Sequence, residues 1–283
     1  MRYAVVDVGG GLRGAYAAGI FDCLMDRGLS FDLCVGVSAG SANVGSFLAG
    51  QRGRNYWFYT RYAFRREYMG IRNYLKKRSY LDLDYIYGTL SAPGGEDPFD
   101  YARFRDNPGE FLAVATDAVT GEPRYFGKEW VTAENMNVFK ASSAIPFVSR
   151  PHYVGGTACF DGALSDPIPV DKALDMGCDR VLLILTRPLD YIRTPETDRR
   201  LAKRIRRHYP LAAEGLCRRA ERYNAGVAHA RELAAEGVVK IFAPADTFGV
   251  NTLTRDRSGL RRLYAEGYQD AAGADLNGFS RGS

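Results

Sequence analysis

The sequence lacks a long hydrophobic run, a leader-like N-terminus and any clustered cysteine motif. No stretch of about 18 apolar residues occurs, so a membrane-spanning helix is not expected. The N-terminal residues Met1 and Arg2 lead directly into the apolar run YAVVDV, which is typical of a buried strand and not of a signal peptide. The five cysteines are odd in number and form no Cys-x-x-Cys motif, which argues against a disulfide framework or a zinc site. We therefore expect a cytoplasmic protein with reduced thiols and no bound metal.

Histidine is also scarce, and this limits the candidates for a general base. The chain contains three histidines, at positions 152, 208 and 229. His208 lies in the basic stretch KRIRRHYP and His229 in VAHARELAAEG, and both patterns indicate solvated helix residues. His152 follows Pro151 in a predicted loop, and the sequence leaves it open as a base.

The composition fits a folded α/β protein. The chain has 283 residues, of which 46% are apolar, and it contains no fixed-period repeat. Apolar runs at 3–8, 33–37, 111–116, 180–185 and 238–242 predict strands that are buried on both faces. The stretch 14–28 between the first two runs has helical spacing, and such a strand–helix–strand unit favours a parallel sheet. Residues 116–126 predict a hairpin, and residues 196–236 predict helix interrupted at Pro210.

The second predicted strand ends in GVSAG, a G-x-S-x-G motif with Ser38 at its centre. A serine on a sharp strand-to-helix turn exposes its hydroxyl, and glycines two residues away on either side prevent a collision. An apolar run precedes this motif and the small-residue stretch SANVGSFLAG follows it, so the context fits a nucleophilic serine. The alternative is an ordinary strand-to-helix turn that happens to contain serine.

A glycine-rich stretch, VDVGGGLRG, follows the first predicted strand and has two interpretations. Gly9, Gly11 and Gly14 have the G-x-G-x-x-G spacing of a dinucleotide-binding loop. The same backbone N–H groups could instead hold the negative charge of a reaction intermediate. Asp32 lies near the expected ribose-binding distance, but it precedes the second strand, whereas a ribose-binding acid should follow it.

Together these motifs resemble the patatin-like phospholipase family. GGGLRG (9–14), GVSAG (36–40) and DGA (161–163) occur in the order of that family, and the segments 141–151 and 166–170 are also similar to it. The resemblance covers residues 3–186, and residues 187–283 form a helical, basic C-terminal portion. A departure is Val8, which separates Asp7 from the triple glycine. We expect a single domain over 1–283, a three-layer α/β/α sandwich with a mainly parallel central sheet.

The resemblance implies a Ser–Asp dyad without histidine. Ser38 would be the nucleophile and Asp161 the base, Gly10 and Gly11 would supply oxyanion N–H groups, and Arg13 would add positive charge. Taken alone, Asp161 before a glycine is more typical of a hairpin turn. The implied function is a serine acyl hydrolase for lipid-like esters that needs no cofactor. The alternatives are an inactive lipid- or membrane-binding module and a dinucleotide-dependent oxidoreductase.

Positive charge is concentrated in two segments. Residues 51–80 contain nine Lys/Arg and one Glu, and residues 193–222 contain ten Lys/Arg and four Asp/Glu, although the net charge of the chain is only +5. Residues 54–80 also interleave nine aromatic residues with these cations. One interpretation is a face that docks peripherally on anionic lipid at the inner membrane surface. The other is a solvated helix with core-facing aromatics. The hydrolase motifs argue against nucleic acid as a partner, and oligomeric state is not indicated.

Overall fold

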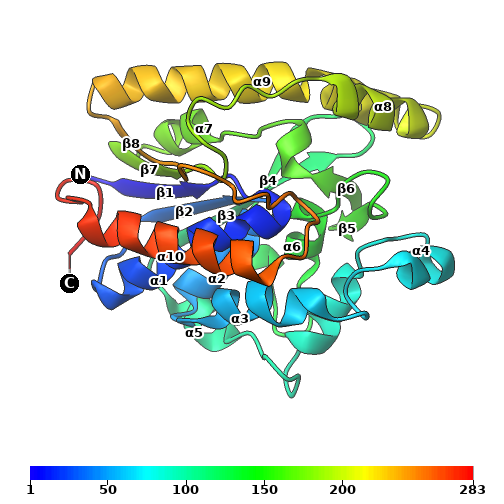
Figure 1. The fold of residues 1–283 in the computed structure, drawn as a ribbon, viewed down its shortest axis with the longest axis horizontal. Coiled ribbons are helices and arrows are strands. Elements are labelled where there is room, and N and C mark those ends of the chain that lie inside the picture. Colours follow the sequence, from blue (N-terminus) through cyan, green and yellow to red (C-terminus); the bar gives the residue numbers. More distant parts are fainter. Residues whose placement is uncertain (283) are drawn as a thin grey trace.

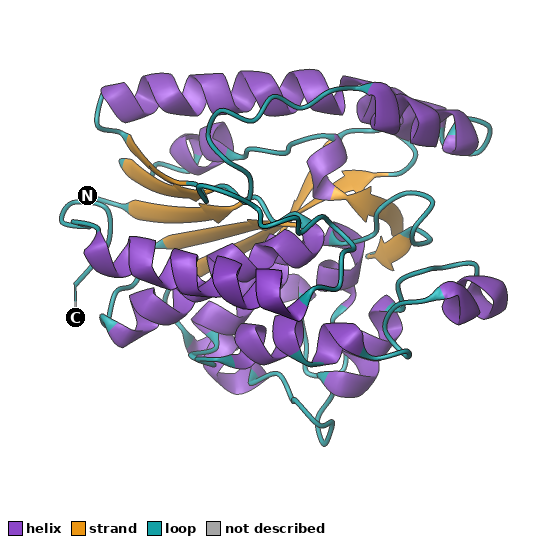
Figure 2. Cartoon of the chain, in the orientation of Figure 1, coloured by secondary structure: helices purple, strands orange, loops and turns teal. Residues whose placement is uncertain are grey.

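The computed structural model describes residues 1–282, and these form three layers with a sheet in the middle (Figures 1 and 2). The eight-stranded sheet has the order β5-β6-β3-β2-β1-β7-β8, with β4 paired to β3. The strands are β1 Tyr3–Asp7, β2 Leu33–Val37, β3 Glu110–Asp117, β4 Pro123–Phe126, β5 His152–Val154, β6 Thr157–Asp161, β7 Arg180–Ile184 and β8 Val239–Phe242. Strands β1, β2, β3, β7 and β8 pair in parallel, whereas β4, β5 and β6 pair antiparallel. The expected three-layer fold is confirmed.

Helices cover both faces of the sheet. They are α1 Ala15–Asp26, α2 Ala39–Leu48, α3 Arg54–Thr60, α4 Ile71–Lys77, α5 Tyr101–Asp106, α6 Asn137–Ser142, α7 Val170–Asp175, α8 Glu196–Ile205, α9 Pro210–Ala235 and α10 Arg257–Gly273. In Figure 1, α7, α8 and α9 lie above the sheet, and α1, α2, α3, α5 and α10 lie below it. The carboxyl ends of β1, β2 and β7 therefore meet between two helical layers.

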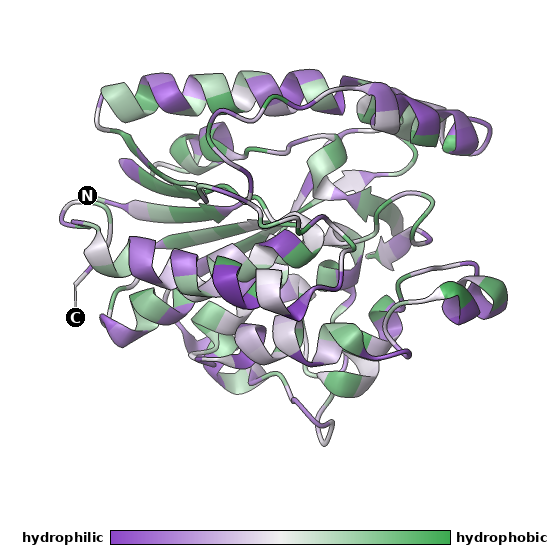
Figure 3. Ribbon diagram, viewed as in Figure 1, coloured by the Kyte–Doolittle hydropathy of each residue, from purple (hydrophilic) through white to green (hydrophobic). Residues whose placement is uncertain are grey.

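Two cores account for the apolar strands. Val5 and Cys34 belong to the core that includes α1, α2 and α10, whereas Val6 and Val35 belong to the core that includes α7 and α9. Successive strand side chains point to opposite faces of a sheet, so strands covered on both faces must be apolar throughout. Figure 3 shows this as continuous hydrophobic colour along the central strands and mixed colour on the outer helices.

Most predicted elements are confirmed, including the parallel strands, the β3–β4 hairpin and the break before Pro210. The sequence missed β5 and β6, which are short and paired to each other. The prediction that His152 lies in a loop is wrong, because it pairs with Cys159 at the start of β5. The sequence expected a helical C-terminal portion over 187–283 but did not locate α10 within it. Its buried positions Leu260, Leu263, Gly267 and Ala271 follow helical spacing, but they include small residues that give a weak hydrophobic signal.

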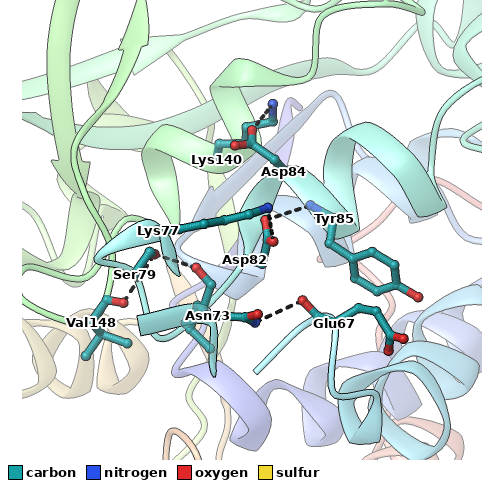
Figure 4. Close-up of polar contacts among 10 residues, drawn as sticks. Glu67, Asn73, Lys77, Ser79, Asp82, Asp84, Tyr85, Lys140 and Val148 are labelled. Atoms are coloured by element: carbon teal, nitrogen blue, oxygen red, sulfur yellow. Dashed lines mark hydrogen bonds and ion pairs between the residues drawn. The ribbon is translucent and has the colours of Figure 1, made fainter. Parts of the chain in front are cut away.

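The basic segment that contains α4 projects from the helical layer (Figure 1). An antiparallel β-bridge between Met69 and Leu81 joins the two ends of this projecting segment, residues 69–81, which is called the α4 excursion below. Figure 4 shows its polar contacts: the Asn73 amide donates to the Glu67 carbonyl at 3.0 Å, and Lys77 pairs with Asp82. These contacts hold a short helix whose outer side chains are exposed. Within residues 1–282 no helix is long and apolar enough to cross a membrane.

Candidate active site

Ser38 lies on the sharp turn between β2 and α2. Its backbone has φ 57° and ψ −130°, a conformation that residues other than glycine rarely adopt. The flanking glycines permit close approach: a Cβ on Gly36 would lie 2.4 Å from the Ser41 Cα, and one on Gly40 would lie 2.3 Å from the Asp7 carbonyl oxygen. The motif therefore forms a strained elbow, as its spacing predicts.

Ser142 fixes this elbow from the end of α6. The Ser38 N–H donates to the Ser142 hydroxyl at 2.9 Å, and that hydroxyl donates to the Val114 carbonyl at 2.6 Å. Because Ser142 is fully buried, this two-step contact ties the elbow to β3 without solvent competition. The sequence did not single out Ser142 by itself, although it lies in the family-like segment 141–151.

The glycine-rich loop leaves two N–H groups without an acceptor. The Gly9 N–H donates to the Asp7 carboxylate at 2.8 Å, and the Leu12 N–H donates to the Thr252 carbonyl at 3.0 Å. Gly10 and Gly11 lie between these two residues, and within residues 1–282 their N–H groups donate to no protein acceptor. Gly10 has φ 124°, which a side chain would disfavour. Both glycines line a cavity, and two adjacent uncommitted donors there suit an anion.

Asp7 supports this loop from beneath. Its carboxylate accepts from the Gly9 N–H and, at 2.8 Å, from the Asn43 amide, whose oxygen accepts from the Tyr59 hydroxyl at 3.2 Å. Burial raises the pKa of Asp7 to about 6, while the bonds from Asn43 and Gly9 oppose this rise. Asp7 therefore connects the glycine-rich loop to α2, and the inserted Val8 does not remove this contact.

Asp161 ends β6 and is fully buried in the site. Its carboxylate accepts from the Ala163 N–H at 2.9 Å. Asp161 thereby caps the N-terminus of the short 3-10 helix Gly162–Leu164. The interpretation of this Asp-Gly pair as a hairpin turn is wrong, because the β5–β6 turn lies at residues 155–156. Burial raises the pKa of Asp161. The positive charge of Arg219 opposes this rise most strongly, followed by the influence of Ser38 and of the Ala163 N–H. Ser38 and Asp161 line the same cavity, so the structure brings the two residues of the predicted dyad together.

The three histidines lie elsewhere. His229 is exposed on α9, where it contacts Asp171 at 3.1 Å, and His208 is exposed between α8 and α9. Burial lowers the pKa of His152, on β5. The nearby Asp84 opposes this change, and Lys140 adds to it. Among the described residues, no histidine lines either cavity that reaches Ser38.

Two cavities of different character meet at Ser38. The narrower one, about 50 Å³, extends toward α3 and is mainly apolar. Its lining includes Leu12, Phe58, Tyr68, Leu81, Leu83, Ile86 and Leu90. The other, about 260 Å³, opens under α8 and α9 and contains Ser38 together with Asp161, Gly10, Gly11 and Arg13. The structure thus brings all five predicted site residues to the wall of one cavity.

Three further arginines line this second cavity: Arg187, Arg193 and Arg219. Arg13 is only 6% exposed, and burial followed by the nearby Arg187 lowers its pKa to about 9. The sequence singled out Arg13 but not the other three. Its only signal for Arg193 and Arg219 was the positive charge of residues 193–222, which does not indicate where these side chains point.

Comparisons with known proteins agree with the sequence resemblance. A family model described as patatin-like phospholipase matches residues 8–174, and a second, described as a domain of unknown function (DUF6363), matches residues 209–274. The uncharacterized protein YjjU of Escherichia coli is 32% identical over 205 residues, which cover 71% of this chain and 57% of that protein. The uncharacterized NTE family protein Rv1063c of Mycobacterium tuberculosis is 27% identical over 193 residues, 65% of this chain and 48% of that protein.

The chain therefore spans about half the length of the curated relatives it matches. Among solved structures, VipD from Legionella pneumophila aligns with a TM-score of 0.47 at 13% identity, covering 96% of this chain and 66% of that one. The patatin-like model extends over more than half of the chain and includes both the G-x-S-x-G elbow and Asp161. The chain belongs to the patatin-like phospholipase family.

Proposed function

We propose that the protein is a serine acyl hydrolase that cleaves lipid-like carboxylic esters with a Ser38–Asp161 dyad. The observation that carries this proposal is the set of groups around Ser38, where the two cavities meet. A strained serine there lines the same cavity as a buried carboxylate and two uncommitted N–H groups. This combination supplies a nucleophile, a base and an oxyanion site, which acyl transfer requires.

The reaction would proceed through an acyl-enzyme. The Ser38 oxygen attacks the ester carbonyl carbon while the Asp161 carboxylate accepts its proton, and the N–H groups of Gly10 and Gly11 stabilise the resulting oxyanion. The bond to the alcohol then breaks, and Asp161 returns the proton to the departing alkoxide. Water attacks the acyl group in the same way, giving its proton to Asp161, which finally reprotonates Ser38. The apolar cavity supplies a place for the acyl chain.

The surroundings of Asp32 argue against the dinucleotide alternative. This residue accepts from the Tyr3 N–H at 2.8 Å and pairs with Arg281, so it closes the amino end of β1. A ribose-binding acid belongs at the opposite, carboxyl end of the strands. The inactive binding module is less favoured, because Ser38, Asp161 and the glycine-rich loop are all present.

Covalent labelling tests the proposed nucleophile. A fluorophosphonate probe should react with the native protein, and peptide mapping should place the adduct on Ser38. The matched control is Ser41→Ala, three residues further along in the first turn of α2, which should keep labelling. Absence of labelling in folded native protein, or an adduct on another residue, would contradict the proposal.

We also propose that the α4 excursion docks on anionic lipid beside the apolar cavity. Tyr68 and Leu81, at the two ends of the excursion, line that cavity. On α4 itself, Ile71 and Leu75 are 67% and 74% exposed and share one helical face. Exposed Arg72 and Lys76 flank this face. Exposed apolar side chains among cations fit a lipid surface, whereas the buried aromatics of residues 54–68 belong to the core.

A further inference from the structure

The cavity under α9 contains more positive charge than its own carboxylates balance. Arg13, Arg187, Arg193 and Arg219 line it, and its carboxylates are Asp161 and Asp198. Four guanidinium groups around one cavity repel each other, and burial strengthens that repulsion. The lowered pKa values of Arg13 and Arg219 have burial as their first cause and neighbouring arginines as their second.

Asp198 balances two of these arginines. The Arg193 guanidinium donates to both Asp198 oxygens at 2.9 Å, a bidentate pair, and Arg219 lies 3.8 Å from the same carboxylate. Asp198 is only 1% exposed, so it is committed to this structural contact. It offers no free oxygen pair to a cationic ligand.

Arg13 and Arg187 have no carboxylate partner among residues 1–282. Arg13 donates to the Thr252 hydroxyl at 3.1 Å, and Arg187 stacks over the Tyr191 ring at 4.1 Å. The Nε atoms of both side chains are buried and have no hydrogen-bond partner. Unpaired buried donors are costly, so each of these side chains is prepared to bind an anion.

These arginines come from separate parts of the chain. Arg13 lies within the glycine-rich stretch, Arg187 follows β7, and Arg219 lies on α9. Both Arg187 and Arg219 lie outside residues 8–174, and Arg219 lies within residues 209–274, the region matched to a domain of unknown function. The C-terminal portion therefore completes the wall of a cavity whose nucleophile comes from the N-terminal portion.

From this geometry we infer that the arginine-lined cavity binds a phosphate monoester on the alcohol half of the ester substrate. The inference rests on the proposed hydrolase function and names its substrate class. The apolar cavity would take the acyl chain, Ser38 would face the carbonyl between them, and Arg13 and Arg187 would contact the phosphate. Guanidinium groups bind phosphate oxygens through charge-assisted pairs. Since Asp198 is occupied, head groups with an ammonium and neutral head groups fit less well.

A matched pair of small substrates tests this inference without a membrane surface. The substrates are 1-octanoylglycerol and 1-octanoylglycerol 3-phosphate, which differ only in the phosphate. We expect the native protein to favour the phosphate ester by about tenfold or more in kcat/KM. Arg187→Gln should reduce this preference about tenfold. The variant suits the test because the arginines that lower the pKa of Asp161 are Arg219 and Arg193. The control Arg218→Gln, at an exposed neighbour of Arg219 that pairs with Glu214, should keep the native preference.

Inorganic phosphate separates a head-group site from a free-phosphate site. Competitive inhibition of phosphate-ester cleavage that weakens in Arg187→Gln would support the inference. Inhibition by phosphate without any preference for the phosphate ester would overturn it, because the cavity would then bind free anion only. A preference near one in the native protein would overturn it too. The same holds if Arg187→Gln slows both substrates equally, since that result indicates a structural role.

The two proposals fail in different ways. If the native protein carries a fluorophosphonate adduct on Ser38 and cleaves 4-nitrophenyl butyrate but shows no phosphate preference, only the head-group inference is wrong. If it cleaves neither 4-nitrophenyl butyrate nor either glycerol ester, the hydrolase proposal itself is wrong.

Discussion

Two opposing influences act on the charge of Asp161. Burial raises its pKa, while Arg219 and the contacts with Ser38 and the Ala163 N–H lower it. A base acts only when ionised, so the proposed reaction should gain rate as pH rises through the pKa of Asp161. The position of that acid limb then reports on the charge of Arg219.

Arg219→Gln should move the acid limb of the pH–rate profile to higher pH. Removing the guanidinium takes away the strongest influence that favours the ionised carboxylate. The measurement is kcat/KM for 4-nitrophenyl butyrate against pH. Arg218→Gln is the control, since its side chain is 60% exposed and pairs with Glu214. An acid limb that stays in place in Arg219→Gln, or moves equally in both variants, would show that Asp161 is not the titrating base.

Asp7 should make the stability of the protein depend on pH. Its pKa is about 6 in the folded protein against an ordinary value of 3.8, because it is buried. Between these values the folded state holds a proton that the unfolded state has lost, so the free energy of unfolding falls as pH rises. The loss amounts to about 2 kcal/mol from pH 4 to pH 7.

Asp7→Asn removes this titration. Urea unfolding from pH 4 to pH 7 measures the free energy of unfolding of both proteins. The native value minus the variant value should decrease as pH rises. The slope of the difference is the readout, because the substitution itself alters the contacts with Gly9 and Asn43 at every pH. A difference that is constant with pH would mean that Asp7 does not titrate in this range.

At the scale of helices and strands, the sequence predicted what local patterns specify. The apolar runs of β1, β2, β3, β7 and β8 and the turn at Ser38 are strong local signals. Strands β5 and β6 were missed because both are short, and β6 joins the sheet by pairing with the distant strand β3 rather than through its own pattern. The arginine-lined cavity was missed for the same reason, since Arg13 and Arg219 meet only after α9 packs over the sheet.

Helix α10 packs unusually close to α1. A Cβ on Gly267 would lie 2.0 Å from the Tyr16 carbonyl oxygen, and one on Gly19 would lie 2.0 Å from the Tyr264 carbonyl oxygen. The Tyr16 hydroxyl donates to Asp270 at 2.6 Å across the same contact. Two backbones can approach this closely only where side chains are absent, so these glycines fix how α10 docks.

Gly267→Val should separate the two helices and destabilise the fold by about 3 kcal/mol or more. Urea unfolding followed by circular dichroism measures the change. The control is Gly273→Ala at the end of the same helix, where an added Cβ meets no atom within 4 Å. An unfolding midpoint for Gly267→Val equal to that of the native protein would show that this contact contributes little.

For the whole molecule, the proposed lipid surface and the proposed active site lie next to each other. The α4 excursion projects beyond the body of the protein, and its base borders the apolar cavity. Removal of two cations from α4 should weaken binding to anionic vesicles by about 2 kcal/mol, roughly 30-fold. The variant is Arg72→Gln with Lys76→Gln.

Co-sedimentation with phosphatidylglycerol and phosphatidylcholine vesicles measures this binding. The control double variant, Arg218→Gln with Arg231→Gln, changes two exposed cations on α9 in the layer across the sheet. Native binding should favour phosphatidylglycerol and weaken at high salt. Equal binding to both lipids, no binding to either, or equal loss in the two double variants would contradict the docking proposal.

The choice of base tests the account most directly. Hydrolysis of 4-nitrophenyl butyrate should be measured for Asp161→Asn and for alanine variants of the three histidines, with circular dichroism to confirm folding. Asp161→Asn keeps the shape of the side chain and removes its basicity, so kcat/KM should fall by about 10³-fold or more. His152→Ala, His208→Ala and His229→Ala should each stay within about tenfold of the native value. An active Asp161→Asn, or a folded histidine variant without activity, would contradict the Ser38–Asp161 dyad.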